Sequence, residues 1–136
     1  MRIVLDTNVL MSGIFFAGPP HQILNAWRSG RFVLVLSPEI LEEYYRTAEE
    51  LSEQFGDMGV QRILSLLAVH SELVNAPLMS SQVCSDRDDD KFIACALAGS
   101  SKIIVSGDKA LLRVSGYKGV EVLRPRQFLD LHLRGR

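Results

Sequence analysis

The sequence has few cysteines and no long apolar run, and each of these absences excludes a class of protein. Its two cysteines, Cys84 and Cys95, form no Cys-x-x-Cys or Cys/His pairs, which excludes a disulfide framework and a zinc motif. No apolar run reaches the roughly eighteen residues that span a bilayer. The first residues also lack the charged, apolar and cleavage regions of a signal peptide. We therefore expect a cytoplasmic protein that does not associate with membranes.

An excess of positive charge is also missing. The net charge is −1, whereas nucleic-acid-binding domains usually show a strongly basic balance. The charges are unevenly distributed, with acids clustered at residues 39–57 and 86–90 and basic residues concentrated at 124–136. Separate acidic and basic surfaces are expected. The 136 residues, 47% of them hydrophobic, fit one compact domain that spans residues 1–136.

Short apolar runs alternate with segments of helical periodicity. The runs that predict buried strands are residues 2–5, 32–36, 72–75, 102–105 and 120–123. The segments that predict helices are residues 21–29, 38–55, 60–67, 92–98, 110–114 and 124–133. Strands that alternate with helices, each strand a continuous apolar run, are typical of a parallel sheet covered on both faces. The predicted fold class is α/β.

Two aspartates lie at or just beyond the ends of predicted strands. Asp6 ends the first apolar run, and Asp108 follows the run at 102–105. Functional crevices of parallel sheets lie at the carboxyl ends of the strands, so these carboxylates are expected to lie close together. Their mutual repulsion would raise at least one pKa, and a hard cation such as Mg²⁺ would relieve it. Asp6, Thr7 and Asn8 have turn-forming side chains and are interpreted as a turn after the first strand. A single aspartate after a strand is usually a turn residue, so the metal hypothesis depends on further acids at the same edge.

The helix predicted at 38–55 offers two adjacent glutamates. Successive residues advance by about 100° around a helix, which places Glu42 nearly opposite the apolar Tyr44. Glu43 instead borders the apolar stripe and can reach the edge of the sheet. Glu43 is therefore the predicted ligand.

The acidic run at 86–90 supplies the remaining candidates. Asp89 and Asp90 both stand above apolar positions of the helix that follows, so helical geometry leaves open which of them approaches a metal and which supports it. Acids in a first helical turn also interact favourably with the helix dipole. Both aspartates therefore remain candidate ligands.

These segments resemble the four acidic motifs of PIN-domain nucleases. The matching segments are Val4-Leu-Asp-Thr-Asn8, Ser37-Pro-Glu-Ile-Leu-Glu-Glu43, Asp86-Arg-Asp-Asp-Asp-Lys-Phe92 and Ile104-Val-Ser-Gly-Asp108. The resemblance spans nearly the whole chain. The forms Ser-Gly-Asp-Lys and Asp-Asp-Lys-Phe look most like the VapC-like branch, whose members are classed as toxins of toxin–antitoxin systems.

The resemblance implies a three-layer α/β/α fold whose five-stranded parallel sheet has the order 3-2-1-4-5. It also implies an endoribonuclease that hydrolyses RNA with Mg²⁺ or Mn²⁺, forms a homodimer and binds an antitoxin protein. The acids carried over as catalytic metal ligands are Asp6, Glu43, Asp89, Asp90 and Asp108. Asn8 and Ser106 carry over as polar residues that orient a carboxylate or water. One or two ions can be accommodated by such a set.

An acidic pocket repels RNA, so cations around it must hold the substrate. The first candidates are Lys91, Lys109 and Arg113, which lie next to the motif acids in the sequence. A longer basic track is expected from Arg124, Arg126, Arg134 and Arg136.

Two other functions remain open from the residues alone. An Asp-based phosphatase also places Asp at the end of its first strand, but such enzymes typically carry a second Asp two residues later, where this chain has Asn8. A non-catalytic module could use the same acids to hold a structural ion while its surface binds a partner. Assays of RNA cleavage and of phosphatase activity would distinguish these hypotheses.

Overall fold

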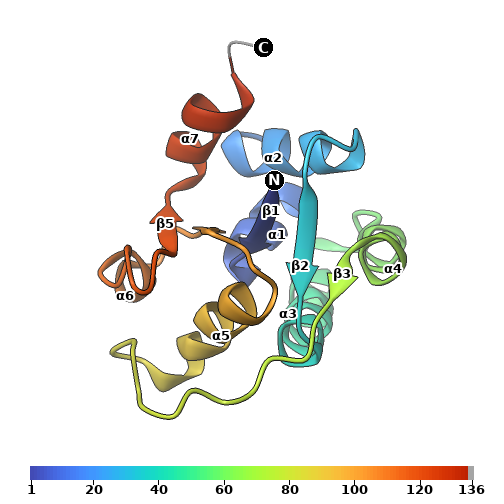
Figure 1. Cartoon of the computed structure of the whole chain (residues 1–136). Coiled ribbons are helices and arrows are strands. Elements are labelled where there is room, and N and C mark those ends of the chain that lie inside the picture. The colour runs from blue at the N-terminus through green and yellow to red at the C-terminus, as the bar shows by residue number, and fades with distance from the viewer. Residues whose placement is uncertain (135–136) are drawn as a thin grey trace.

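The chain folds around a five-stranded sheet, seen in a computed structural model that describes residues 1–134 (Figure 1). The strands are β1 (Arg2–Leu5), β2 (Val33–Leu36), β3 (Glu72–Leu73), β4 (Ile103–Val105) and β5 (Glu121–Leu123). Their order is β3-β2-β1-β4-β5, and every neighbouring pair is parallel. The predicted α/β class and the order 3-2-1-4-5 are confirmed.

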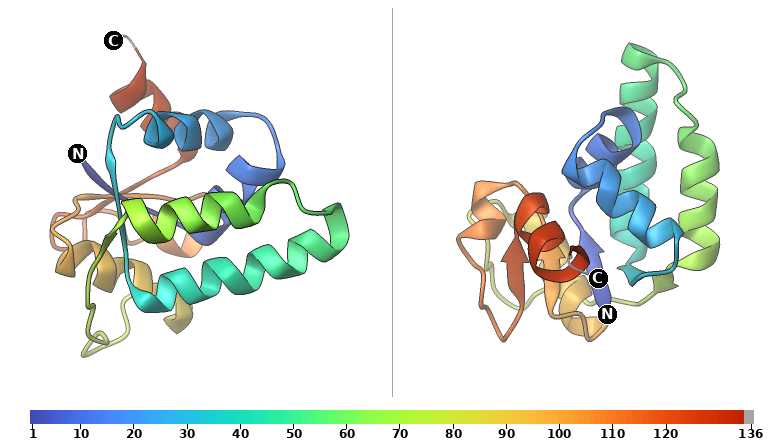
Figure 2. Two further views of the ribbon diagram at one scale, coloured as in Figure 1. Left: turned by 90° about the vertical axis from the view of Figure 1, so that its right-hand side faces the viewer. Right: turned by 90° about the horizontal axis from the view of Figure 1, so that it is seen from above.

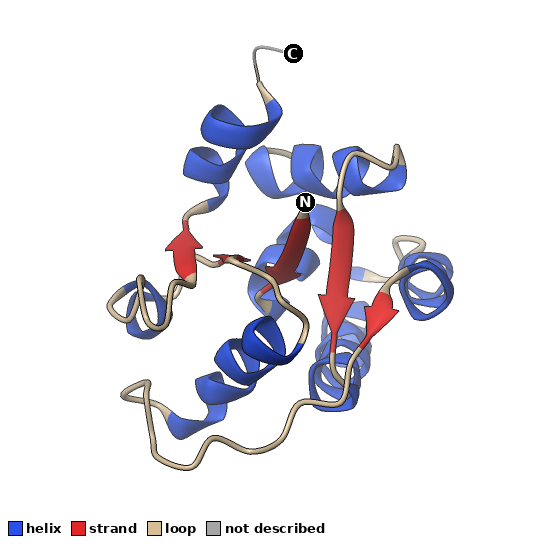
Figure 3. Ribbon diagram, viewed as in Figure 1, coloured by secondary structure: helices blue, strands red, loops and turns tan. Residues whose placement is uncertain are grey.

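Helices cover both faces of this sheet, which is the inner layer in Figure 3. They are α1 (Thr7–Phe15), α2 (Pro19–Arg28), α3 (Pro38–Phe55), α4 (Val60–His70), α5 (Asp90–Ala98), α6 (Lys109–Leu112) and α7 (Pro125–Phe128), with the 3₁₀ turn η1 (Arg87–Asp89) and the π-helical segment η2 (Leu129–Leu133). Figure 2 shows α3 and α4 side by side on one face, whereas α5 contacts β1, β2 and β4 from the other. None of the helices described here has the length and apolarity to cross a membrane.

Helix α3 is the longest element, and its ends follow from local sequence chemistry. The side chain of Ser37 caps its first turn by accepting a hydrogen bond from the Ile40 N–H at 3.3 Å. Pro38 takes the first helical position, where its missing N–H costs nothing, and Gly56 follows the last turn with a positive φ of 84°. This start was predicted, and it fixes which face of α3 meets the sheet.

The first helix was not predicted. The polar residues Asp6, Thr7 and Asn8 were interpreted as a turn after the first strand, but in the structure Asp6 is the N-cap of α1. Asp and Thr are favourable both in turns and at helix starts, because their side chains can bind nearby backbone N–H groups. Seven of the nine α1 residues are buried, so the apolar face of this helix is too broad to show a clear helical stripe.

Tyr44 ties α3 to the end of β1. Its hydroxyl donates a hydrogen bond to the Leu5 carbonyl oxygen at 2.6 Å, in a fully buried position. We expect Tyr44→Phe to lower the free energy of unfolding by about 1–3 kcal/mol, because a buried acceptor loses its partner. Urea denaturation provides the measurement. Tyr45→Phe, which changes an exposed neighbour, should stay within about 0.5 kcal/mol of the wild type, and an equal loss in both variants would contradict the assignment.

Candidate active site

The carboxyl ends of β1 and β4 bring Asp6 and Asp108 to one edge of the sheet. The Asp6 N–H donates to the Val105 carbonyl oxygen at 3.0 Å, which continues the pairing of the two strands. Buried Ser106 links the two acids, because its hydroxyl donates to Asp6 Oδ2 at 2.6 Å and accepts from the Asp108 N–H at 2.9 Å. Ser106, predicted as a helper that orients a carboxylate, therefore contacts the carboxylate of one acid and the backbone of the other.

Helix α3 presents Glu43 to the same edge. The hydroxyl of buried Thr7 donates to the Glu43 carboxylate, and the Lys91 ammonium forms an ion pair with it. The adjacent Glu42 lies on the exposed side of α3, where it pairs with Arg46 at 3.3 Å. The helical wheel thus predicted the orientation of this pair. Thr7 was overlooked as a site residue because it was interpreted only as part of a turn.

Asp89 and Asp90 lie in different surroundings. The Asp89 carboxyl interacts with the Asp108 carboxylate. Burial and this interaction raise the pKa of Asp89 to about 7, and repulsion from Asp86 and Asp6 contributes to the same shift. Asp90 is buried and accepts backbone hydrogen bonds from the N–H groups of Val83 at 3.0 Å and Cys84 at 2.7 Å. The structure therefore brings Asp89 to the other acids and directs Asp90 to the loop.

The surroundings of Asp90 also explain its acidity. Burial works to raise the pKa of this carboxyl, but the backbone N–H groups of Val83 and Cys84 stabilise the charged form and hold the pKa below its usual value. Asp90 thus remains charged because the loop at residues 74–86 solvates it. Cys84 is a free and buried cysteine, and burial together with Asp90 raises the pKa of its thiol to about 12.

The electrostatics of the four converging acids are unfavourable without a cation. Burial raises the pKa of Asp6, and the charges of Asp108 and Glu43 raise it further, against the opposing hydrogen bond from Ser106. Raised pKa values at Asp6 and Asp89 are the expected result of carboxylates that crowd one another. This edge of the sheet therefore favours either bound protons or a positive ion.

Carboxylate oxygens are the ligands that Mg²⁺ and Mn²⁺ prefer, so the donor chemistry of these four acids fits such an ion. Within residues 1–134, no three Asp, Glu, His or Cys side chains are already spaced to hold a metal ion. Mg²⁺ usually keeps several waters and takes only one or two protein carboxylates, so it does not require a closed protein cage. The carboxylates of Asp6, Glu43, Asp89 and Asp108 therefore fit one or two partly hydrated ions, each held by one or two of them.

Lys91 was predicted as an RNA contact, and the structure places it inside the acidic cluster. Its ammonium pairs with Glu43 and with Asp88 at 3.3 Å, and its side chain is 16% exposed. Although burial opposes the charge, these two carboxylates raise the pKa of Lys91. The ammonium thus provides Glu43 with a counter-charge.

Removal of that counter-charge should be measurable. We expect Lys91→Gln to lower the free energy of unfolding in EDTA by about 1–2 kcal/mol, because a charge-assisted hydrogen bond to Glu43 is lost. Added Mn²⁺ should restore part of that loss by neutralising the same carboxylate. Thermal denaturation with and without Mn²⁺ tests both effects. Lys102→Gln, at an exposed lysine, is the control, and a loss of similar size there would show that Glu43 is not the cause.

The other predicted site residues lie at the surface. Asn8 is exposed on α1, and Lys109 and Arg113 are exposed on α6 and just after it, beside Asp108. In the predicted basic track, Arg134 pairs with Asp130 at 3.1 Å. Arg124 and Arg126 are exposed at the start of α7. Arg136 lies outside the described residues. The structure thus leaves Lys109 and Arg113 exposed within a few residues of the acids.

Two comparisons with known proteins bear on this geometry. A family model described as "PIN domain" matches residues 2–110, which include Asp6, Glu43, Asp89, Asp90 and Asp108. The chain belongs to the PIN domain family. A relative, the uncharacterized protein MJ1680 of Methanocaldococcus jannaschii, is 34% identical over 116 residues, which cover 82% of this chain and 74% of the relative. PIN domains have a nuclease-type fold and generally depend on divalent metal, which agrees with the carboxylate edge of this PIN domain.

Proposed function

We propose that this PIN domain is an endoribonuclease that uses Mg²⁺ or Mn²⁺ to hydrolyse RNA phosphodiester bonds. The observation that supports it is the meeting of four carboxylates from four separate elements at one edge of the sheet. Burial, together with the neighbouring carboxylates, raises the pKa values of Asp6 and Asp89 among them. The ligands in this proposal are Asp6, Glu43, Asp89 and Asp108, with Asp90 in a supporting role.

The chain's own residues prepare this edge for an ion. Ser106 holds the Asp6 carboxylate in place, and the Thr7 hydroxyl does the same for Glu43. Asp89, with a pKa of about 7, retains a proton over part of the neutral range and would release it when a cation takes its place. When bound, a divalent ion supplies positive charge for the phosphate and acidifies a water for attack.

Two glutamates on α3 provide a matched test of the ligand set. We expect Glu43→Gln to reduce cleavage of single-stranded RNA by about 10–100-fold, because a carboxylate of the metal site is lost. Glu49→Gln, at an exposed glutamate further along the same helix, should cleave at the wild-type rate. Initial rates on a fluorescent RNA in Mn²⁺ give the comparison. Equal activity of the two variants would remove Glu43 from the site.

The same assay separates the alternatives. A metal-dependent nuclease cleaves RNA in Mg²⁺ or Mn²⁺ and stops in EDTA. A phosphatase would instead release phosphate from a phosphomonoester, and a non-catalytic module would do neither while still gaining thermal stability from the ion. Wild-type protein that is stabilised by Mn²⁺ and leaves RNA of many sequences uncut would overturn the proposed activity.

For the biological role we propose the toxin of a toxin–antitoxin pair, a cytoplasmic single-domain protein over residues 1–136 that dimerises and is neutralised by an antitoxin. The support is the form of its motifs, Ser106-Gly-Asp-Lys109 and Asp89-Asp-Lys-Phe92. Induced expression of the wild type should then arrest growth, and Glu43→Gln should not. Co-expression of a neighbouring reading frame should restore growth. Growth that is unaffected by an actively cleaving protein would indicate an RNA-processing enzyme instead.

A further inference from the structure

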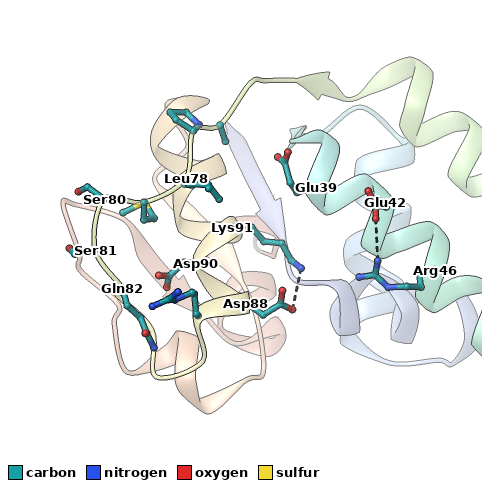
Figure 4. A pocket seen from close by; sticks show the side chains of 15 residues that line it. Glu39, Glu42, Arg46, Leu78, Ser80, Ser81, Gln82, Asp88, Asp90 and Lys91 are labelled. Carbon is teal, nitrogen blue, oxygen red and sulfur yellow. Dashed lines mark hydrogen bonds and ion pairs between the residues drawn. The ribbon is translucent and has the colours of Figure 1, made fainter.

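A groove of about 800 Å³ lies beside the acidic cluster, within the range of about 300–1,000 Å³ typical of small-ligand sites. One wall is the start of α3, the floor includes α5, and the outer wall is the loop at residues 74–86. Figure 4 shows Glu39, Glu42 and Arg46 on α3, Leu78 on the loop, and Lys91 between them. Because Lys91 also pairs with Glu43, the groove opens directly next to the proposed site of cleavage.

The charge of the groove argues against a phosphate as its occupant. Its lining carries three cations and four carboxylates, and two of the cations are already paired, Arg46 with Glu42 and Lys91 with Asp88. A phosphate would meet more repulsion than attraction there. The backbone of a bound strand is therefore expected at the rim near Lys91, outside the groove.

The remaining features fit a nucleobase. Leu78 is 95% exposed on the outer wall, next to Met79 and Pro77, so the groove offers apolar surface to the flat face of a base. Glu39 lies at the inner wall and has no ion-pair partner within residues 1–134. A carboxylate only accepts hydrogen bonds, so it favours a base edge that carries adjacent N–H donors. Guanine presents such an edge through N1–H and N2–H₂, whereas uracil presents one N–H between two carbonyls that the carboxylate repels.

We propose that this groove receives the base of a nucleotide next to the scissile phosphate and selects guanine through Glu39. The inference rests on the proposed ribonuclease function, because the groove matters for sequence preference only where a strand is held for cleavage. Its competing explanation is a purely local role for Glu39 in the first turn of α3, where an acid interacts favourably with the helix dipole.

Binding to the groove can be measured without cleavage. The four methionines of the full chain are labelled with ¹³C in their methyl groups, and guanosine or uridine 5′-monophosphate is titrated in EDTA. Met79 in the groove should shift saturably with the guanine nucleotide and about tenfold more weakly with the uracil nucleotide, the ratio expected for about 1.4 kcal/mol. Met58, exposed in the loop between α3 and α4, should not shift.

Glu39→Gln should weaken binding of the guanine nucleotide about tenfold. Glu53→Gln, fourteen residues and roughly 21 Å further along α3, should not change it. A role limited to the helix dipole would leave the nucleotide titration unaltered in both variants and would overturn the inference. So would a Met79 shift caused by an arginine-containing peptide and by neither nucleotide, which would assign the groove to a partner protein.

Sequencing of RNA ends separates this inference from the proposed function. Wild-type protein should cleave a random-sequence RNA with a guanine preference at one position beside the cut, and Glu39→Gln should lose that preference while it still cleaves. Cleavage without a Met79 shift would overturn only the proposal that the groove binds guanine. A guanine-dependent Met79 shift in a protein that cleaves no RNA would overturn the nuclease and leave the groove a nucleotide site.

Discussion

Replacing Asp6 with asparagine is expected to reduce RNA cleavage by about 10²–10³-fold or more, the range seen when one preorganised charged or polar group is removed from an active site. Asp6 is the buried acid of the cluster, 6% exposed, and the charges of Asp108 and Glu43 act on it. Asparagine keeps its shape and can still accept the hydrogen bond from Ser106. The loss should therefore fall on activity and not on folding.

Stability should move in the opposite direction to activity. The pKa of Asp6 is raised in the folded protein, so the folded state binds its proton more tightly than the unfolded state does. The stability that protonation of Asp6 contributes at low pH is then lost as the pH rises through that raised pKa. Asp6→Asn removes this loss. In EDTA the variant should be at least as stable as the wild type, by an amount that grows with pH and then levels off.

Metal ions give the third readout. An ion that binds only the folded protein stabilises it by about 2.7 kcal/mol at one hundred times its Kd. Wild-type protein should therefore gain thermal stability in Mn²⁺, and Asp6→Asn should gain much less. Asp130→Asn, at an exposed aspartate of η2, serves as the control. A variant that cleaves at the wild-type rate and keeps the Mn²⁺ shift would show that Asp6 is not a ligand.

The sheet could be predicted from the sequence because parallel strands buried on both faces are continuous apolar runs. The apolar runs at residues 2–5 and 102–105 show this directly. In the structure, residues 3–5 of β1 and 103–105 of β4 are buried. The strand order itself came from the resemblance of the motifs and not from periodicity. Helix α1 could not be predicted by pattern, because its residues are buried on most sides and its polar start is equally typical of a turn.

The orientation of side chains at the site was predictable only where a long helix fixed it. Glu43 and Glu42 differ by one step on α3, whose caps and apolar stripe define its register. Asp89 and Asp90 stand where a 3₁₀ turn becomes α5, so a simple helical wheel does not apply. What separates them is the path of the loop at residues 74–86, which brings two backbone N–H groups to Asp90. The hydrophobic periodicity of the sequence does not predict the path of that loop.

Asp90→Asn should destabilise the protein, in contrast to Asp6→Asn. Each oxygen of the Asp90 carboxylate accepts a backbone hydrogen bond, one from Val83 and one from Cys84. Asparagine replaces one oxygen with an NH₂ group, which would face an N–H donor. We expect the free energy of unfolding to fall by about 1–3 kcal/mol, the cost of a buried donor left without a partner. Urea denaturation at neutral pH measures it.

The pH dependence identifies the cause of that loss. The pKa of Asp90 is lowered in the folded protein, so its stabilising contribution is present above the unfolded value of about 3.9 and is lost as the pH falls through the lowered folded value. The difference between wild type and Asp90→Asn should therefore narrow in acid. Trypsin should also cut the variant faster at Arg87, because the loop before it is no longer held to α5.

Asp89→Asn is the matched partner of this variant. It should cleave RNA about 10²-fold more slowly while its stability in EDTA is unchanged or raised, because a carboxyl with a pKa of about 7 is crowded by Asp108. Asp90→Asn should keep much of its activity at temperatures where it remains folded. The opposite pattern, an inactive but stable Asp90→Asn and an active Asp89→Asn, would exchange the two roles. It would require the loop at 74–86 to release Asp90 when an ion binds, since in this structure both of its oxygens are already engaged.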